Sequence, residues 1–293
     1  MNAAVIDAHQ HFWRLSRGDY GWLTADLVPL YRDFEPAHLA PQMQAAGVER
    51  TVVVQAAPTL LETQFLLSLA RQTEWIAGVV GWVDFDSPAA GETLAALARE
   101  PALVGVRPMI QDIPDPEWML GALRAPVFAA LVDCDLAFDA LVRPHHLRHL
   151  RRLLDRQPDL RVVVDHAAKP DIAGGHFNAW ADEIAGLARE SSAVCKLSGL
   201  VTEARPGWRP DDLRRWVDHL LATFGPSRLL WGSDWPVVEL AGGYRAWRKA
   251  TQELLSELSP AERGEVLGGA AVRFYRLTHL EAAEPGAEQP ESR

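Results

Sequence analysis

The sequence predicts a single α/β domain folded as a (β/α)8 TIM barrel. Short apolar or β-branched runs alternate with longer amphipathic segments through most of the 293 residues, as expected for repeated strand–helix units around a parallel sheet. Eight such runs can be counted, which suits a closed barrel of about 250 residues or more. The alternative is an open doubly wound sheet, but no glycine-rich phosphate turn follows the first run.

Each predicted strand is a mainly apolar run that ends close to a polar residue, glycine or proline. In chain order the strands are expected at residues 5–8, 51–55, 76–83, 103–108, 137–142, 161–165, 193–197 and 228–232. Between them, apolar residues recur at three- and four-residue spacing, which is typical of amphipathic helices. The clearest helices are expected at residues 63–72, 91–99, 146–157, 177–190 and 210–224.

One domain is expected over residues 1–280, because no linker or internal repeat interrupts the alternation. Residues 281–293 are rich in Glu, Pro, Ala and Gly, which predicts a disordered C-terminal tail. Residues 12–34 form a long loop that holds Trp13, Tyr20, Trp22 and Tyr31. Such a loop either folds over the barrel mouth as a lid or closes the side of the barrel with an aromatic patch.

The composition restricts the partners. A formal net charge of -10 repels phosphates and anionic lipid, so a small-molecule substrate is expected rather than nucleic acid or a membrane. Cys134 and Cys195 are the two cysteines and lie far from any CxxC spacing, which favours a reducing cytoplasm over a disulfide framework. No signal-peptide pattern or membrane-length apolar run is visible. Homo-oligomerisation is left open.

The first strand leads into a His-x-His pair, His9 and His11. Side chains alternate along an extended segment, so both imidazoles project the same way and can converge on one point. Two histidines at the end of a buried strand are costly without polar partners, although a single histidine there is usually structural. Because barrel enzymes place their chemistry at this end of the strands, the pair predicts a metal site or a group that polarises a substrate carbonyl.

Asp234 follows the eighth strand in the run Gly-Ser-Asp-Trp-Pro. Gly232 frees the turn and Pro236 prevents simple continuation of the strand, so the carboxylate is expected to face the barrel mouth. An aspartate here could instead cap the next helix. Beside His9 and His11, it predicts a catalytic base and a metal ligand.

Two more strand ends carry candidate catalytic groups. His166 ends the sixth strand and would serve as a further ligand or as a donor to a substrate carbonyl. Arg107 ends the fourth strand, where it either binds a substrate oxygen or forms a structural salt bridge. Lys196 and Ser198 at the seventh strand share one face of the strand. The sequence does not tell whether that face points into the barrel or outward.

Substrate-binding residues are expected further out, in the loops that follow the strands. The candidates are His145, His146, Lys169 and Trp22, although solvated surface residues occupy such positions as well.

The motifs, taken in strand order, resemble those of the amidohydrolase superfamily, with an HxH pair after the first strand, a histidine after the sixth and an aspartate after the eighth. Its sugar-lactonase branch is similar to this chain over nearly the whole barrel, at residues 7–13, 104–107, 165–170, 196–200 and 231–236. The resemblance implies a hydrolase that opens a sugar-acid lactone to the aldonic acid. Asp234 would activate water, while His166 and Arg107 would stabilise the developing oxyanion.

The same resemblance implies at most one divalent metal ion, expected to be zinc, held by His9, His11 and Asp234. Arg107 stands where members with two metals place a bridging Lys or Glu, and the resemblance leaves open whether activity needs the ion. A lyase that decarboxylates a small aromatic acid is the main alternative, with Arg107, Arg143 and Lys169 as cations for the carboxylate. A sugar-binding barrel without chemistry is the third.

Overall fold

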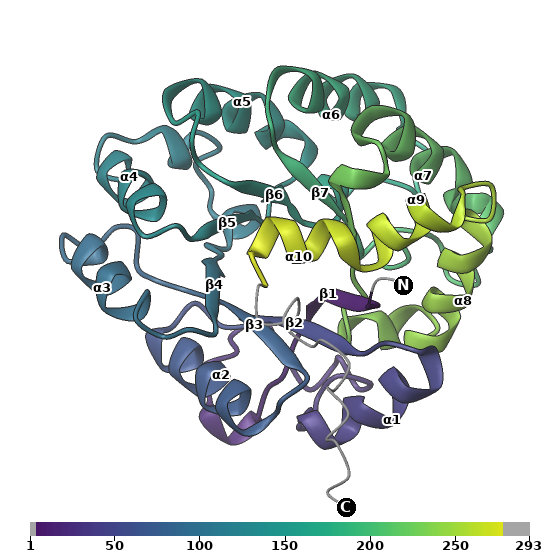
Figure 1. The fold of residues 1–293 in the computed structure, drawn as a ribbon, viewed down its shortest axis with the longest axis horizontal. Coiled ribbons are helices and arrows are strands. Elements are labelled where there is room, and N and C mark those ends of the chain that lie inside the picture. The colour runs from purple at the N-terminus through teal and green to yellow at the C-terminus, as the bar shows by residue number, and fades with distance from the viewer. Residues whose placement is uncertain (1–3, 278–293) are drawn as a thin grey trace, which may run out of the picture.

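The computed structural model describes residues 4–277 and forms a parallel β-barrel surrounded by helices (Figure 1). The eight strands follow one another in the order β1 to β8, each paired in parallel with the next. The ring closes where the segment after β8 meets β1, since the Asp234 N–H donates to the His9 carbonyl at 2.8 Å. This architecture confirms the predicted barrel and rules out the open doubly wound sheet.

The strands are short and their ends lie near the predicted ones. They are β1 Ile6–Gln10, β2 Arg50–Val54, β3 Ile76–Gly81, β4 Leu103–Val106, β5 Ala137–Ala140, β6 Val162–Val164, β7 Val194–Leu197 and β8 Leu229–Trp231. The helices are α1 Pro36–Ala46, α2 Leu60–Gln72, α3 Ala90–Leu97, α4 Ala125–Asp133, α5 Leu147–Arg156, α6 Asn178–Glu190, α7 Pro210–Phe224, α8 Tyr244–Leu254, α9 Pro260–Gly264 and α10 Ala270–Tyr275.

Amphipathic helices cover the outside of the barrel, and α7 illustrates how the sequence builds one. Proline at its first position suits a helix start, and Gly225 lies just past its last residue. Its apolar face is buried through Leu213, Trp216, Val217, Leu220 and Phe224. The strands need no alternation of polar and apolar residues because both of their faces are buried.

Five of the described helices are not among those predicted from the sequence, and these are α1, α4, α8, α9 and α10. These helices have a weak amphipathic pattern or lie late in the chain. In α1, for example, Pro41 lies inside the helix and only Leu39 and Met43 are buried. The prediction also ended the first strand at residue 8, whereas β1 continues to Gln10 because Gln10 pairs with the segment after β8. The predicted tail, 281–293, and residues 278–280 of the predicted domain lie outside the described residues.

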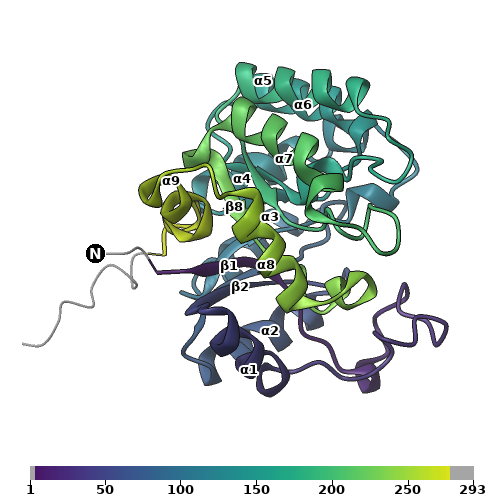
Figure 2. The same cartoon turned by 90° about the vertical axis from the view of Figure 1, so that its right-hand side faces the viewer.

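α10 lies across one end of the barrel (Figure 1). Ala270, Ala271 and Tyr275 pack into the barrel interior with Ile6 of β1 and Val163 of β6. Figure 2 shows the neighbouring α9 at this end and the long loop after β1 at the opposite end. The barrel is therefore sealed at the end where its strands begin, and open access is left to the end where they finish.

Within residues 4–277, no helix is both long and apolar enough to cross a membrane.

Candidate active site

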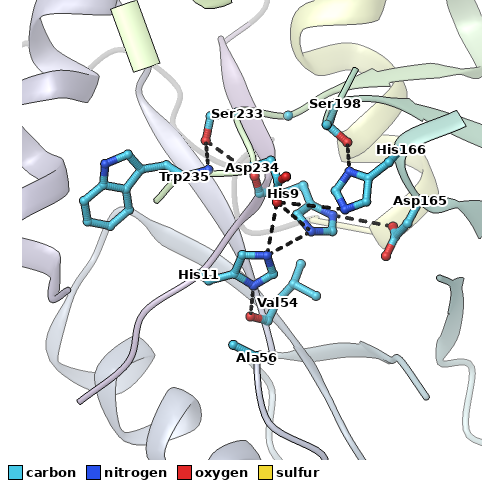
Figure 3. A network of polar contacts seen from close by, with 12 residues as sticks. His9, His11, Val54, Ala56, Asp165, His166, Ser198, Ser233, Asp234 and Trp235 are labelled. Atoms are coloured by element: carbon cyan, nitrogen blue, oxygen red, sulfur yellow. Dashed lines mark hydrogen bonds and ion pairs between the residues drawn. The ribbon is translucent and has the colours of Figure 1, made fainter. Parts of the chain in front are cut away.

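Four predicted residues meet at the end of the barrel where the strands finish (Figure 3). His9 Nε2 lies 3.3 Å from His11 Nε2, which lies 3.3 Å from Asp234 Oδ1. Asp234 Oδ1 is also 3.8 Å from His9 Nε2 and 3.9 Å from His166 Nε2. All four residues are buried, and one carboxylate oxygen faces three imidazoles.

β1 holds the histidine pair. His9 lies within the strand and His11 directly follows it, so both side chains point to the same side, as the alternation predicts. His11 Nδ1 is 2.8 Å from the carbonyl oxygen of Val54 on β2. A carbonyl only accepts, so Nδ1 carries the proton and the lone pair of Nε2 faces the site.

A tight turn after β8 presents Asp234. Its φ of 58° lies in the left-handed region, which few residues other than glycine adopt without cost. The turn is tied to β1 by the Ser233 N–H, which donates to Asp7 Oδ1 at 2.8 Å. Gly232 passes so close that a Cβ there would lie 2.7 Å from the Cβ of His9. These contacts direct the Asp234 carboxylate toward the histidines.

His166 begins a left-handed turn after β6. Residues 166–169 all have φ between 50° and 60°, an unusual run for residues with side chains. His166 Nδ1 lies 2.9 Å from Ser198 Oγ, and Gly199 lies under the ring. The turn thus carries His166 inward and leaves Lys169 at the rim.

The electrostatics separate the carboxylate from the imidazoles. Burial opposes ionisation of Asp234, but the proximity of His166, His9 and His11 outweighs it and holds the pKa of Asp234 below the ordinary value. Burial lowers the pKa of His166 to about 4. Burial and the ammonium of Lys196 keep the pKa of His9 well below its usual range. At neutral pH the site therefore combines an ionised carboxylate with neutral His9 and His166.

His9, His11 and Asp234 fit a divalent ion. Their donor atoms are 3.3, 3.3 and 3.8 Å apart, near the edge of about 3.4 Å expected for a tetrahedron with zinc–nitrogen bonds of about 2.05 Å. Two neutral imidazole lone pairs and a carboxylate are also a donor set that zinc accepts. His9, Asp165 and His166 form a second such group, but Asp165 already pairs with Arg107 and Lys196.

A buried charged cluster, formed by Lys196, Asp139, Asp165 and Tyr275, lies beneath His9. Lys196 Nζ is 2.5 Å from Asp139 Oδ2, 3.0 Å from Asp165 Oδ1 and 3.0 Å from His9 Nδ1. The Tyr275 hydroxyl donates to Asp139 Oδ2 at 2.7 Å. Burial raises the pKa of Asp139 to about 6, whereas Lys196 and His9 overcome burial and hold the pKa of Asp165 well below its usual range.

Arg107 lies between this cluster and the pocket above the site. Its Nη1 is 3.3 Å from Asp165 Oδ2 and 3.3 Å from His9 Nε2, while Nη2 donates to the carbonyl of Gln55. The guanidinium also lines the pocket. Both sequence interpretations therefore apply, since Arg107 forms a structural ion pair and still faces the space for a substrate.

The pocket above the site has a volume of about 240 Å³. Trp22 and Lys169, two of the predicted substrate-binding residues, line it together with Met109, Gln111 and Leu141. Lys169 Nζ is 3.6 Å from Glu203 Oε1. The pocket is open above the histidines, so a small ligand would rest directly on Asp234 and His166.

His145 and His146 are not among the described residues that line this pocket. The His146 ring turns back onto its own segment, where its Nδ1 accepts from the Arg143 N–H at 3.0 Å. His145 is exposed and stacks on His146 with ring centroids 3.9 Å apart. The structure therefore places these two residues away from the described lining of this pocket, because the turn at Pro144 uses them to start α5.

The loop of residues 12–34 closes on itself and reaches the pocket. Trp13 and Phe34 pair in a short antiparallel bridge. The Tyr20 hydroxyl donates to Glu62 Oε2 at 2.7 Å, and the Trp22 indole N–H donates to the Ala56 carbonyl at 2.7 Å. The loop thus combines both expectations, because Trp13 fills an aromatic cluster and Trp22 forms a pocket wall.

The buried cluster was missed by the sequence interpretation, which left the direction of Lys196 open and gave Asp139 and Tyr275 no role. A signal was present, since Lys196 and Asp139 are opposite charges within two short apolar strands. Charges in such strands are costly unless they are paired. Gln111 and Met109 carried no comparable signal.

Known proteins resemble this chain along nearly its whole length. The amidohydrolase family model matches residues 6–277. An L-fucono-1,5-lactonase of Burkholderia ambifaria is 47% identical, over 93% of this chain and 95% of the relative. Another, of Burkholderia multivorans, is 39% identical over 94% and 97%. A crystal structure of an amidohydrolase from Burkholderia multivorans with bound zinc has a TM-score of 0.87 at 39% identity, covering 94% of this chain and 99% of that one. The chain belongs to the amidohydrolase family.

Proposed function

We propose that this protein hydrolyses the 1,5-lactone of a sugar acid, with a lactone of the L-fuconate type as its substrate and Asp234 as the base that activates water. The observation that carries the proposal is the ionised Asp234 carboxylate, set among three imidazoles at the floor of a pocket of about 240 Å³. Two relatives named L-fucono-1,5-lactonase support the substrate class.

The reaction begins when Asp234 takes a proton from a water molecule in the pocket. The oxygen of that water adds to the lactone carbonyl carbon, and negative charge develops on the carbonyl oxygen. When the tetrahedral intermediate collapses, the bond between the carbonyl carbon and the ring oxygen breaks. Asp234 then returns its proton to that oxygen, which becomes a hydroxyl of the aldonic acid.

Arg107 and His166 are the groups that face the developing oxyanion. Arg107 is a permanent cation whose position is fixed by Asp165 and by the Gln55 carbonyl. His166 is neutral and can donate from Nε2 when Ser198 donates to its Nδ1. Donors that are already fixed stabilise the transition state without reorganising.

One zinc ion would be held by His9, His11 and Asp234. When bound, such an ion polarises a carbonyl and lowers the pKa of a water molecule. Because a lactone is more reactive than an amide, we expect the residues of this chain to retain some turnover without it. A relative that crystallised with bound zinc supports the choice of metal.

Trp22 and Lys169 would orient the sugar ring. The indole offers an apolar face for the ring carbons, and the ammonium at the rim donates to hydroxyl oxygens. We also propose a cytoplasmic setting, which suits the free thiols of Cys134 and Cys195.

The decarboxylase alternative has less support, because one of the three cations it would use for a substrate carboxylate lies away from the site. Arg143 is exposed and outside the described lining of the pocket.

The test is a panel of sugar lactones assayed by the fall in pH, with and without chelator, on wild type and Asp234→Asn. Loss of a general base lowers turnover by roughly 10²–10⁴-fold, so we expect a drop of this size for the variant. Asp211→Asn is the matched control, since that side chain is exposed and pairs with Arg214 on the surface. Near-wild-type turnover by Asp234→Asn would show that the base is assigned wrongly, and carbon dioxide release from aromatic acids without lactone hydrolysis would favour the lyase.

A further inference from the structure

A second cavity adjoins the pocket above the site. It has a volume of about 540 Å³, more than twice the 240 Å³ of the active-site pocket. Trp22, Met109 and Asp112 line both cavities. The other walls come from the loops after β1, β2, β3 and β4. A ligand seated over Asp234 could therefore extend past Trp22 into the second space without leaving the protein surface.

The walls of this second cavity are aromatic. Trp82, Phe85 and Trp118 line it in addition to Trp22. Trp118 is held in place, since its ring packs on Phe85 with centroids 5.6 Å apart and the Arg124 guanidinium lies 4.7 Å from its centre. The hydrogen bond from Trp22 to the Ala56 carbonyl fixes the shared wall in the same way. These rings are thus rigid apolar surfaces that lose little freedom when a ligand binds.

The charged side chains that line the cavity are all carboxylates. Asp19, Asp84, Asp86 and Asp112 line it, and the described lining contains no Lys, Arg or His. Asp84 and Asp112 are exposed, so their carboxylates are available to hydroxyl donors from a ligand. An anion would be repelled here. A sugar ring matches this surface, since it has apolar C–H faces for indole rings and hydroxyl groups that donate to carboxylates.

We propose that the second cavity is a carbohydrate subsite, which takes a glycosyl group attached to the lactone that is opened over Asp234. The proposal rests on the lactone hydrolysis proposed above and extends its substrate class to lactones of glycosylated aldonic acids. The active-site pocket is smaller than the roughly 300–1,000 Å³ of sites for drug-sized ligands, which suits one ring, and the second cavity receives the other. The reaction is unchanged: water adds across the lactone bond, and the glycosidic bond stays intact.

The experiment compares pairs of substrates. The monosaccharide 1,5-lactone that the enzyme opens best is assayed beside the same lactone glycosylated at one hydroxyl, in a series that covers each free position. We expect at least one glycosylated member to have a KM about tenfold lower than its parent, which corresponds to roughly 1.4 kcal/mol of binding. Trp118→Ala is expected to abolish this advantage while it leaves kcat/KM for the parent lactone within about twofold.

A second variant keeps the test independent of folding, because Trp118 is buried. Asp84 is exposed, and its Oδ1 accepts from the Asp86 N–H at 3.0 Å, a contact that the amide oxygen of Asp84→Asn can retain. This variant should also weaken the glycosylated substrate only. Trp208→Ala is the matched control, since Trp208 lines a different cavity between the loop after β7 and α8, and it should preserve the advantage.

The outcomes separate the subsite from the proposed function. If the parent lactone is hydrolysed but no glycosylated member binds better, or if the advantage survives both cavity variants, the subsite is refuted and the lactonase stands. If no lactone is hydrolysed at all, the proposed function fails, and the subsite as stated fails with it. Competitive inhibition by tetramethylammonium that is lost in Trp118→Ala, without any gain from glycosylation, would assign the aromatic and acidic cavity to a cation instead.

Discussion

Gly199 shows how much of the site depends on a single missing side chain. Its φ is +64°, and a Cβ there would lie 2.5 Å from Nδ1 of His166. We therefore expect Gly199→Ala to displace the imidazole and to lower kcat for lactone hydrolysis by about 10²-fold, the usual effect of misplacing a catalytic group by roughly 1 Å. Steady-state kinetics with the parent lactone measure this.

Gly175 is the matched control for this substitution. It has a similar φ of +73°, but a Cβ there would have no neighbouring atom within 4 Å. Both alanine variants should lose about 1 kcal/mol of unfolding free energy for the left-handed backbone, and only Gly199→Ala should lose activity. Equal kinetic effects in the two variants would mean that the contact with His166 is unimportant.

Removal of Lys196 should lower the stability of the fold strongly. Its ammonium is fully buried and contacts both Asp139 and Asp165. Lys196→Met leaves the buried carboxylate of Asp139 without its counter-charge, which costs about 3–5 kcal/mol in comparable cases. We expect this loss in urea unfolding followed by circular dichroism.

The double variant Lys196→Met with Asp139→Asn tests whether the stability loss comes from a buried carboxylate that lacks its counter-charge. Asp165 keeps its ion pair with Arg107, so neutralising Asp139 removes the carboxylate that has lost its cation, and part of the lost unfolding free energy should return. If the double variant is less stable than Lys196→Met alone, the charge interaction is not what holds Lys196 in place.

At the scale of elements, the loop of residues 12–34 is attached to the helix α2 through Glu62. This carboxylate accepts from the Tyr20 hydroxyl and from the Ala56 N–H, and Arg17 lies 3.4 Å away. Burial raises the pKa of Glu62 from 4.5 to about 7, since those contacts offset it only in part.

The raised pKa predicts how the stability changes with pH. Between pH 4.5 and about 7, folded Glu62 keeps a proton that the unfolded chain has lost, so raising the pH favours unfolding. Glu62→Gln removes this titration. From pH 4.5 to 8 we expect the unfolding free energy of wild type to fall relative to Glu62→Gln by an amount on the order of 3 kcal/mol. Urea unfolding of both proteins across this pH range measures the difference, and two parallel curves would contradict the prediction.

At the scale of the whole molecule, Tyr275 links the sealed end of the barrel to the active end. It belongs to α10, and its hydroxyl donates to Asp139, which pairs with the lysine beside His9. Tyr275→Phe should lower the unfolding free energy by about 1–3 kcal/mol, because a buried charged acceptor loses its donor. Tyr31→Phe, at a residue that is 45% exposed, should change it little. Thermal unfolding of the two variants checks this, and equal melting temperatures would show that the hydroxyl contributes nothing.

The barrel and its central residues could be predicted because they depend on local and repeated signals. Eight apolar runs gave the strand order, and the alternation of a strand placed His9 and His11 on one side. The orientation of Asp234 could be predicted because Gly232 and Pro236, which shape its turn, lie next to it in the sequence. Sequence alone does not give the tilt of β7, and therefore did not reveal whether Lys196 points inward. The contact between Tyr275 and Asp139 joins residues 136 positions apart, and no local pattern predicts such a pairing. His145 and His146 lie away from the described pocket lining, and the sequence does not distinguish a turn that starts a helix from a loop at the pocket.

The position of α10 also has a consequence for how the protein is made. All eight strands precede this helix in the chain, and a ribosome releases them first. Until α10 emerges, the interior formed by Ile6 and Val163 lies open to water and Asp139 lacks the tyrosine. A nascent chain that already holds every catalytic residue should therefore remain inactive and prone to aggregation, and it should acquire activity only when its last described helix has been translated.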